Sequence, residues 1–87
     1  MALKIYWTKR AYHKFDDIIL YLTTNWGEKT ISIFVKKVYD FFDILTVFPD
    51  IGTIENESKN IRGFVIVKQI TLFYKVSGNK IIILNFF

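Results

Sequence analysis

The chain of 87 residues contains no cysteine, and it has a single histidine and a single proline. Without cysteine the protein has neither disulfides nor thiolate metal ligands, which is typical of a reducing compartment such as the cytoplasm. The sequence also lacks an apolar run of the ~18 residues that a membrane span needs, and its start lacks the features of a signal peptide. We therefore expect a soluble, cytoplasmic protein that has no membrane partner.

Acidic residues are absent from Ser58 to Phe87, a stretch that holds five of the twelve Lys and Arg residues. The remainder of the chain carries seven Lys and Arg against eight Asp and Glu, so the formal net charge of +4 arises in the C-terminal part. That part is also among the most apolar of the chain. Its charge favours acidic partners, either nucleic acid or an acidic protein, but says nothing about the fold.

The length allows one small domain, 1–87, which is close to the size at which burial only just offsets chain entropy. No internal repeat, low-complexity segment or linker interrupts it. All secondary structure elements must therefore share one core.

The first half of the chain predicts two amphipathic helices. After a short β-type run at Leu3–Trp7, Thr8 can cap the first helix, and Pro49 ends the second. Asn25 and Glu28 have the spacing of a capping box between the two helices, which should pack as an antiparallel hairpin. The apolar positions recur every three or four residues, as one buried helix face requires: Ala11, Phe15, Ile18 and Leu22, then Ile31, Phe34, Val38, Phe41, Leu45 and Phe48.

Beyond an irregular connection at Asp50–Asn60, the apolar period changes to two and predicts strands. A tight turn at Lys68–Gln69 would direct one set of side chains toward the helices, namely Ile61, Gly63, Val65, Val67, Ile70, Leu72, Tyr74 and Val76. The opposite face would then show Arg62, Phe64, Ile66, Thr71, Phe73 and Lys75. A second turn at Ser77–Lys80 leads into Ile81–Phe87, whose uniform apolarity leaves the side of Asn85 open but suits a central strand.

The predicted fold is α+β, with the order β-α-α-β-β-β and a helical hairpin packed on a small, mainly antiparallel sheet. Four short motifs follow one another along this order: Asn25-Trp26-Gly27, Phe48-Pro49-Asp50-Ile51-Gly52, Arg62-Gly63-Phe64 and Leu72-Phe73-Tyr74-Lys75-Val76. Together they resemble the RelE/ParE superfamily of bacterial toxins, closer to its ParE-like members. The resemblance implies the toxin of a type II toxin–antitoxin (plasmid stabilisation) pair, which an antitoxin neutralises by laying a flexible segment across it.

The resemblance leaves two modes of action, because RelE-like members cleave mRNA on the ribosome and ParE-like members bind DNA gyrase. Cleavage looks dependent on strand-borne cations and on an Arg and a Tyr beyond the fourth strand, which would stabilise charge on the phosphate. Here Thr71 stands where the third-strand Arg is expected, and the second strand reads Phe64-Val65-Ile66-Val67 without its Lys residues. The chain also stops at Phe87 before the terminal pair, and only Lys75 and Arg62 could contact phosphate.

We therefore predict no catalytic residues and an inhibitor of DNA gyrase that acts by binding. A ribosome-dependent mRNA endonuclease is the alternative, and a member that binds an antitoxin but is no longer toxic is a third interpretation.

The sequence gives little support for histidine-based catalysis or for metal binding. His13 lies off the buried helix line and reads as a solvated residue, away from any nucleophile and orienting acid. Neither the pair Asp16 and Asp17 nor the pair Asp40 and Asp43 has the ligand count or glycine-bearing loop of a metal site. We expect no metal and no cofactor.

The predicted face that carries Arg62 and Lys75 is an apolar strip edged by cations. Such a strip suits an acidic, amphipathic segment that folds on binding. We predict that this strip binds the antitoxin or the target through Arg62, Phe64, Ile66, Lys68, Thr71, Phe73 and Lys75. The simpler interpretation is that the loop Asp50–Asn60 or a homodimer covers it. The expected partners are a cognate antitoxin, in a toxin–antitoxin hetero-oligomer, and DNA gyrase, or the ribosome and mRNA under the alternative.

Overall fold

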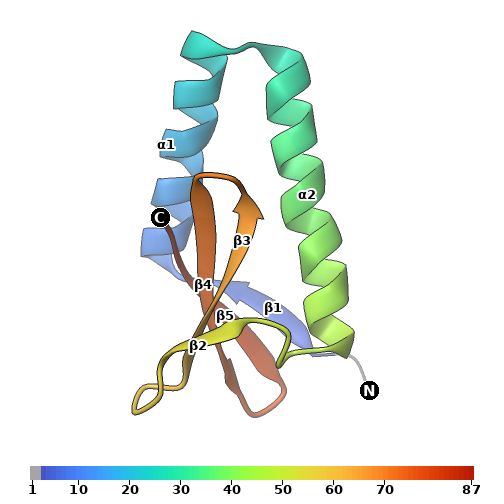
Figure 1. Cartoon of the computed structure of the whole chain (residues 1–87), viewed down its shortest axis with the longest axis vertical. Helices are drawn as coiled ribbons and strands as arrows, with labels where there is room; N and C mark the ends of the chain where they lie inside the picture. Colours follow the sequence, from blue (N-terminus) through green and yellow to red (C-terminus); the bar gives the residue numbers. More distant parts are fainter. Residues whose placement is uncertain (1–2) are drawn as a thin grey trace.

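A helical hairpin covers one face of a five-stranded sheet in the computed structural model, which describes residues 3–87 (Figure 1). The elements are β1 (Lys4–Trp7), α1 (Lys9–Asn25), α2 (Glu28–Val47), β2 (Thr53–Asn56), β3 (Ile61–Val67), β4 (Ile70–Ser77) and β5 (Lys80–Phe86). The strand order is β1-β5-β4-β3-β2, with β1 parallel to β5 and all other pairs antiparallel. This arrangement confirms the predicted α+β fold and the central place of the final strand. No helix within residues 3–87 is long and apolar enough to span a membrane.

Thr8 ties the first helix to the last strand. Its hydroxyl oxygen accepts a hydrogen bond from the Ala11 amide at 3.1 Å, as predicted for the N-cap of α1. The same hydroxyl donates to the Ile83 carbonyl of β5 at 2.8 Å. Because an N-cap satisfies an amide that the helix leaves unpaired, one side chain both begins α1 and joins it to the sheet.

The core lies between the helices and the inner face of the sheet. The helical positions predicted to be buried contact it, except for Phe48. The partly buried Trp7 packs against it, with its ring centroid 5.2 Å from that of Phe15, 5.5 Å from Phe42 and 5.6 Å from Phe86. Such aromatic pairs add about 0.5–1.5 kcal/mol each beyond the area that they bury.

The connection between the helices is not the predicted capping box. Asn25 is the last residue of α1, and its side-chain amide donates to the Tyr21 carbonyl at 2.9 Å. Gly27 instead precedes α2, with a φ of 106° that favours glycine and without a side-chain cap. The box fails because α1 continues through Asn25, which therefore cannot turn its side chain onto the next helix.

The segment after α2 differs from the prediction at two places. Phe48 is in phase with the buried line, yet it is 64% exposed because the backbone leaves the helix there, at φ −125° and ψ 73°. Thr53–Asn56 lies inside the connection expected to be irregular, but it pairs with β3 as an edge strand. Four strands therefore follow the helices rather than three. Since most of β2 is exposed, it carries no apolar alternation by which the sequence could reveal it.

The β3–β4 hairpin has the predicted turn at Lys68–Gln69 but not the predicted faces for β3. Val67 pairs with Ile70 beside the turn, as predicted, but the next pair is Val65 with Thr71. Ile66 is therefore an extra residue of β3 in a β-bulge. A shift of one residue moves every following side chain to the opposite face. The remainder of β3 is therefore inverted relative to the prediction.

The inversion divides the predicted binding strip. Phe64 points toward the helices and stacks on Phe41 with ring centroids 4.1 Å apart, while Ile66 is buried and Arg62 pairs with Tyr74, which is also buried. The prediction that Arg62, Phe64 and Ile66 share a face with Thr71, Phe73 and Lys75 was wrong. The bulge is the physical reason, because it lets Phe64 enter the core.

Two neighbouring substitutions test this register. Phe64→Ala should lower the free energy of unfolding by about 3 kcal/mol, since it removes a stacked core ring. Val65→Ala should change it by less than about 0.5 kcal/mol, because Val65 is 58% exposed on the other face. Urea unfolding followed by circular dichroism measures both. The reverse order of the two effects would contradict the bulge.

Candidate functional site

The outer face of the sheet, the side away from the helices, carries three of the seven predicted binding residues. Cross-strand partners share a face, so Thr71, Phe73 and Lys75 of β4 lie with the outward residues of β3 and β5. A second bulge, in β5, places Asn85 opposite Phe73. The outward residues also include the cations Lys4 and Lys80, together with Tyr6, Ile61, Gly63, Val65, Ser77, Ile82 and Leu84.

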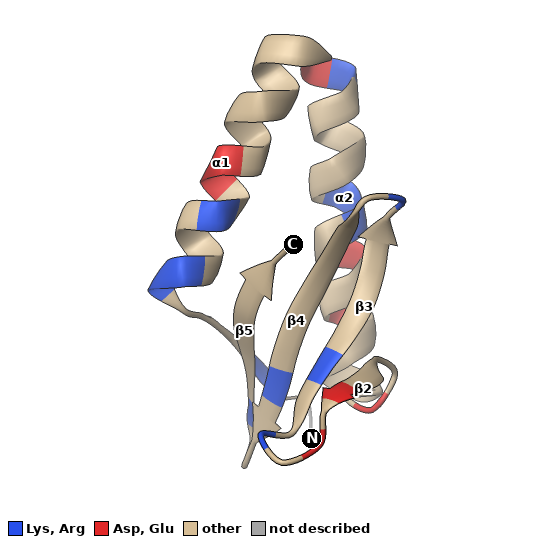
Figure 2. Ribbon diagram, turned by 60° about the vertical axis from the view of Figure 1, so that its left-hand side comes forward, with Lys and Arg blue, Asp and Glu red and all other residues tan. Residues whose placement is uncertain are grey.

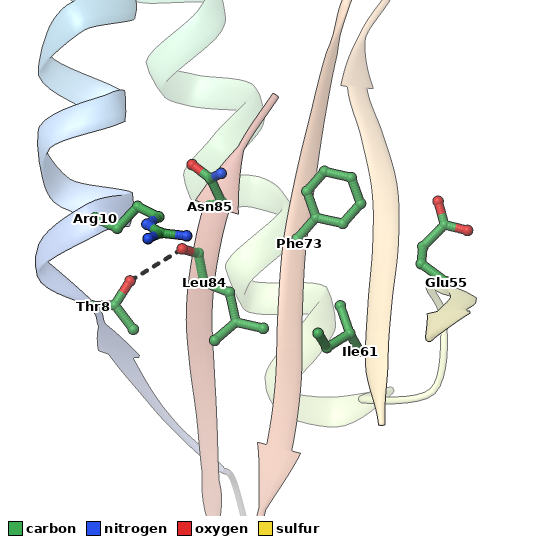
Figure 3. Close-up of a pocket in the computed structure, with 7 residues that line it drawn as sticks. All are labelled: Thr8, Arg10, Glu55, Ile61, Phe73, Leu84 and Asn85. Carbon is green, nitrogen blue, oxygen red and sulfur yellow. Dashed lines mark hydrogen bonds between the residues drawn. The ribbon is translucent and has the colours of Figure 1, made fainter. Parts of the chain in front are cut away.

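A pocket of about 550 Å³ lies on this outer face (Figure 3). Apolar side chains form its floor, and a cation and an anion stand at opposite ends, Arg10 of α1 and Glu55 of β2. The pocket is lined by Thr8, Arg10, Glu55, Ile61, Phe73, Leu84 and Asn85. We call it the outer pocket.

The sequence analysis did not predict that a residue of α1 lines the outer pocket. Arg10 lies two residues after the cap Thr8, in the first turn of α1, and that turn contains no acidic residue. Positive charge near a helix N-terminus is unfavourable, so this cation was a signal that the residue has another role. Leu84 and Asn85 gave no signal, because their orientation depends on the bulge.

A second hollow lies between α1 and the β3–β4 turn, and we call it the helix–turn groove. It has a volume of about 770 Å³ and exposes two aromatic side chains, Tyr21 at 60% and Trp26 at 68%. Lys68, the remaining predicted binding residue, lines it from the turn. Its other lining residues are Lys14, Asp17, Ile18, Leu22, Thr30, Val67, Gln69 and Ile70.

The two hollows meet along α1. The Lys14 ammonium, which lines the helix–turn groove, lies 5.6 Å from the centroid of the Phe87 ring. Arg10 precedes Lys14 by four residues on the helix, and residues at that spacing are neighbours. The outer pocket and the groove thus both lie beside α1, which places cations next to each of them, and we call the two hollows together the channel. Figure 2 shows basic bands on α1 and on β4.

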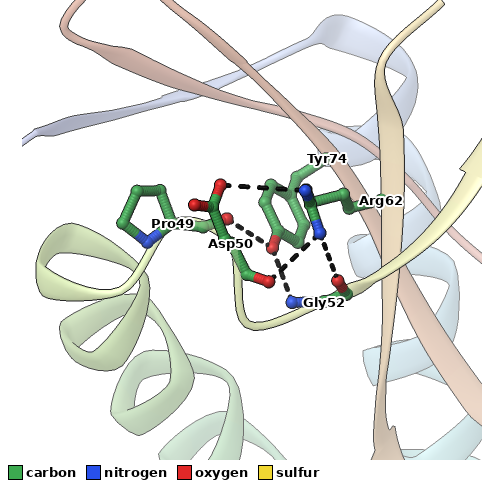
Figure 4. A network of polar contacts seen from close by, with 5 residues as sticks. All are labelled: Pro49, Asp50, Gly52, Arg62 and Tyr74. Carbon is green, nitrogen blue, oxygen red and sulfur yellow. Dashed lines mark hydrogen bonds and ion pairs between the residues drawn. The ribbon is translucent and has the colours of Figure 1, made fainter. Parts of the chain in front are cut away.

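Arg62 does not lie on the outer face but holds a loop (Figure 4). Its guanidinium donates to the carbonyls of Asp50 at 3.1 Å and Gly52 at 2.8 Å. The Asp50 carboxylate is 3.8 Å away and its side chain is largely exposed, so the carbonyl contacts matter more than this ion pair.

The buried Tyr74 also forms hydrogen bonds with this loop. Its hydroxyl donates to the Pro49 carbonyl at 2.7 Å and accepts from the Gly52 amide at 2.9 Å. A Cβ on Gly52 would lie 2.8 Å from this hydroxyl, so the close approach requires glycine. Burial raises the pKa of the Tyr74 phenol above its ordinary value of 10.0, although the Gly52 hydrogen bond and the Arg62 charge oppose the shift. The phenol is therefore a proton donor at neutral pH.

The histidine and the paired aspartates considered in the sequence analysis lie on the helix surfaces. His13 is exposed on α1, as predicted. The carboxylates predicted to be solvated are exposed as well, and Asp40 pairs with Lys36 at 2.8 Å. No group of three or more His, Cys, Asp and Glu side chains in this part of the chain could hold a metal ion.

The comparisons with known proteins agree with this architecture. A family model described as the ParE toxin of the type II toxin–antitoxin system parDE matches residues 5–87. This chain belongs to the ParE toxin family. No curated protein matches it. A solved structure described as the chromosomal ParDE TA system from P. aeruginosa superposes with a TM-score of 0.76 at 18% identity, covering 98% of this chain and 94% of that chain.

Membership of the ParE family makes the chain a type II toxin with an antitoxin as its partner. The predicted superfamily and its ParE-like branch are thereby confirmed. The structural match at this identity supports the fold alone, so the roles of individual residues rest on the geometry described above.

Tyr74→Phe tests how firmly the loop is held. The variant leaves the Gly52 amide without its buried acceptor, so we expect a loss of about 1–2 kcal/mol in unfolding free energy and faster hydrogen exchange at Gly52. Because the folded pKa is raised, the phenol's contribution is fully present below pH 10 and is lost as pH rises through the folded value. The stability gap to the variant should therefore narrow above pH 10. The exposed Tyr39→Phe is the control, and a gap that widens with pH would contradict the network.

Proposed function

We propose that this ParE-family toxin acts in the cytoplasm by binding and inhibiting DNA gyrase, and that a cognate antitoxin neutralises it. The observation that carries the proposal is the chemistry of the outer face, where a nucleic acid-cleaving member would need a cluster of cations. Thr71 and Phe73 stand there instead, whereas the outward cations Lys4, Lys75 and Lys80 lie toward the turn between β4 and β5. The choice of gyrase as the target comes from the family.

A phosphodiester-cleaving site needs cations placed against the developing charge and groups that transfer protons. The stretch of β3 that would supply lysines reads Phe64-Val65-Ile66-Val67, in which Phe64 and Ile66 face the core. Lys75 and Arg10 are the cations that border the outer pocket, and His13 lies outside it. This arrangement favours binding over RNA cleavage as the source of toxicity.

The channel made by the outer pocket and the helix–turn groove suits the antitoxin. Its exposed rings and apolar floor offer anchors for a helix with one apolar face. The three cations of its lining, Arg10, Lys14 and Lys68, outnumber the two acidic residues, Asp17 and Glu55. An acidic, amphipathic segment that folds on binding therefore complements it, and toxin and antitoxin would form a hetero-oligomer. A homodimer of the toxin alone stays a prediction.

The mode of action can be measured by inducing the chain in growing bacteria and giving short pulses of labelled thymidine and labelled amino acid in parallel. DNA synthesis should fail first, and the purified chain should inhibit supercoiling by gyrase. Earlier failure of protein synthesis would overturn the proposal in favour of an RNA-cleaving toxin. Failure of neither would indicate a non-toxic antitoxin-binding protein.

Charge reversal tests the antitoxin channel. Lys14→Glu combined with Lys75→Glu should weaken binding of the antitoxin about tenfold or more at low salt, because both cations border the channel. The control is Lys37→Glu with Lys59→Glu, which changes the net charge equally on exposed residues outside the channel. Titration calorimetry gives both affinities. Equal losses in the two variants would reject this placement of the antitoxin.

A further inference from the structure

The end of α2 and the loop after it present an apolar projection, which we call the Phe48 knob: Val47, Phe48, Ile51 and Ile54. Their exposed fractions are 64%, 64%, 43% and 50%. Val47 to Ile51 are contiguous around one surface hollow, and Ile54 shares the side of β2 on which Arg62 reaches the loop. Contiguous apolar patches on a small protein commonly mark interaction sites.

The knob is held rigidly although it is exposed. Arg62 and Tyr74 fix the carbonyls of Pro49, Asp50 and Gly52 by hydrogen bonds of 2.7–3.1 Å (Figure 4). The Ile51 amide also donates to the Phe48 carbonyl at 3.2 Å. An exposed loop does not need so many buried contacts for its own sake. Preorganisation of this kind lowers the entropy lost when apolar side chains enter a partner.

Acidic side chains surround the knob in a protein that is otherwise basic. Asp43 precedes Val47 by four residues on α2 and so lies beside it, and Asp50 is part of the loop. Arg62, the cation nearest to them, is engaged by the loop carbonyls. Figure 2 shows acidic bands at β2 and its flanking loops. This charge disfavours nucleic acid and anionic lipid, and it favours a protein surface edged by Lys and Arg.

The knob lies apart from the antitoxin channel. Figure 1 places it where α2 ends and β2 begins, whereas the helix–turn groove lies between α1 and the β3–β4 turn. No residue of the knob lines the outer pocket or the groove. A second partner could therefore reach the knob by contacts of its own.

We propose that the Phe48 knob is the surface with which this toxin contacts its target protein, by inserting Phe48 and Ile51 into an apolar pocket bordered by basic residues. The inference rests on the proposed function, because it assumes a toxin that acts by binding. It adds the contacting residues and the chemistry of the partner surface. Gyrase need not be the target for it to hold.

The test is the double variant Phe48→Gln with Ile51→Gln, compared with wild type and with Leu20→Gln, which replaces a similarly exposed apolar residue on α1. The inducer concentration for half-maximal growth arrest should rise about tenfold or more in the double variant, as loss of hot-spot anchors predicts, and stay unchanged in Leu20→Gln. Affinity for the antitoxin should not change, which also establishes that the variant folds.

Asp43→Lys provides an independent variant. A cation in the last turn of α2 suits the helix dipole, so this change should not destabilise the fold. It should nevertheless raise the inducer concentration for arrest, because it reverses charge beside the knob. A structural role of Asp43 would not produce that result.

Unchanged growth arrest by the double variant, with antitoxin binding intact, would overturn the inference. So would a wild-type oligomer that the double variant dissociates without losing toxicity, since a second copy would then cover the knob. A wild-type chain that never arrests growth rejects the inference together with the proposed function. Arrest without gyrase inhibition, relieved in the double variant, rejects gyrase alone and supports the knob.

Discussion

The stacking of Phe64 on Phe41 determines which residues each side of the sheet presents. The rings lie 4.1 Å apart at the centre of the contact between α2 and β3. Since side chains alternate along a strand, placing Phe64 inward places Ile61, Gly63 and Val65 outward. The bulge at Ile66 allows Phe64 to face inward while β3 still leads into the tight turn before β4. The outer pocket and the position of Arg62 against the loop both follow from it.

Periodicity and capping chemistry were sufficient to predict the architecture. The three- and four-residue spacing from Phe34 to Leu45 predicted the buried line of α2, and Thr8 was recognised as a cap because its acceptor lies next to the amides that need one. These signals are local. The elements that the sequence did not reveal depend on non-local pairing: β2 is an exposed edge, and the bulge in β3 depends on a ring from α2.

The candidate site was predictable only where it depended on β4. Thr71, Phe73 and Lys75 alternate strictly with the buried Leu72 and Tyr74, so their common face could be predicted. Arg62 looked like a binding cation because sequence alone does not show a backbone carbonyl as its partner. Phe48 kept the helical period past the last helical residue, and period counting cannot detect where a backbone leaves the helix. The larger errors thus concerned the path of the backbone rather than the chemistry of the side chains.

The position of β5 has a consequence for how the toxin is made. This strand is the last of the chain, yet it lies inside the sheet, pairs with β1 and β4, and contributes the buried Ile81, Ile83 and Phe86. A nascent chain on the ribosome therefore cannot close its core while β5 is still inside the exit tunnel. The folded protein, and with it any harmful contact, arises only after β5 has emerged from the ribosome. An antitoxin made beforehand would thus meet the toxin as it first folds.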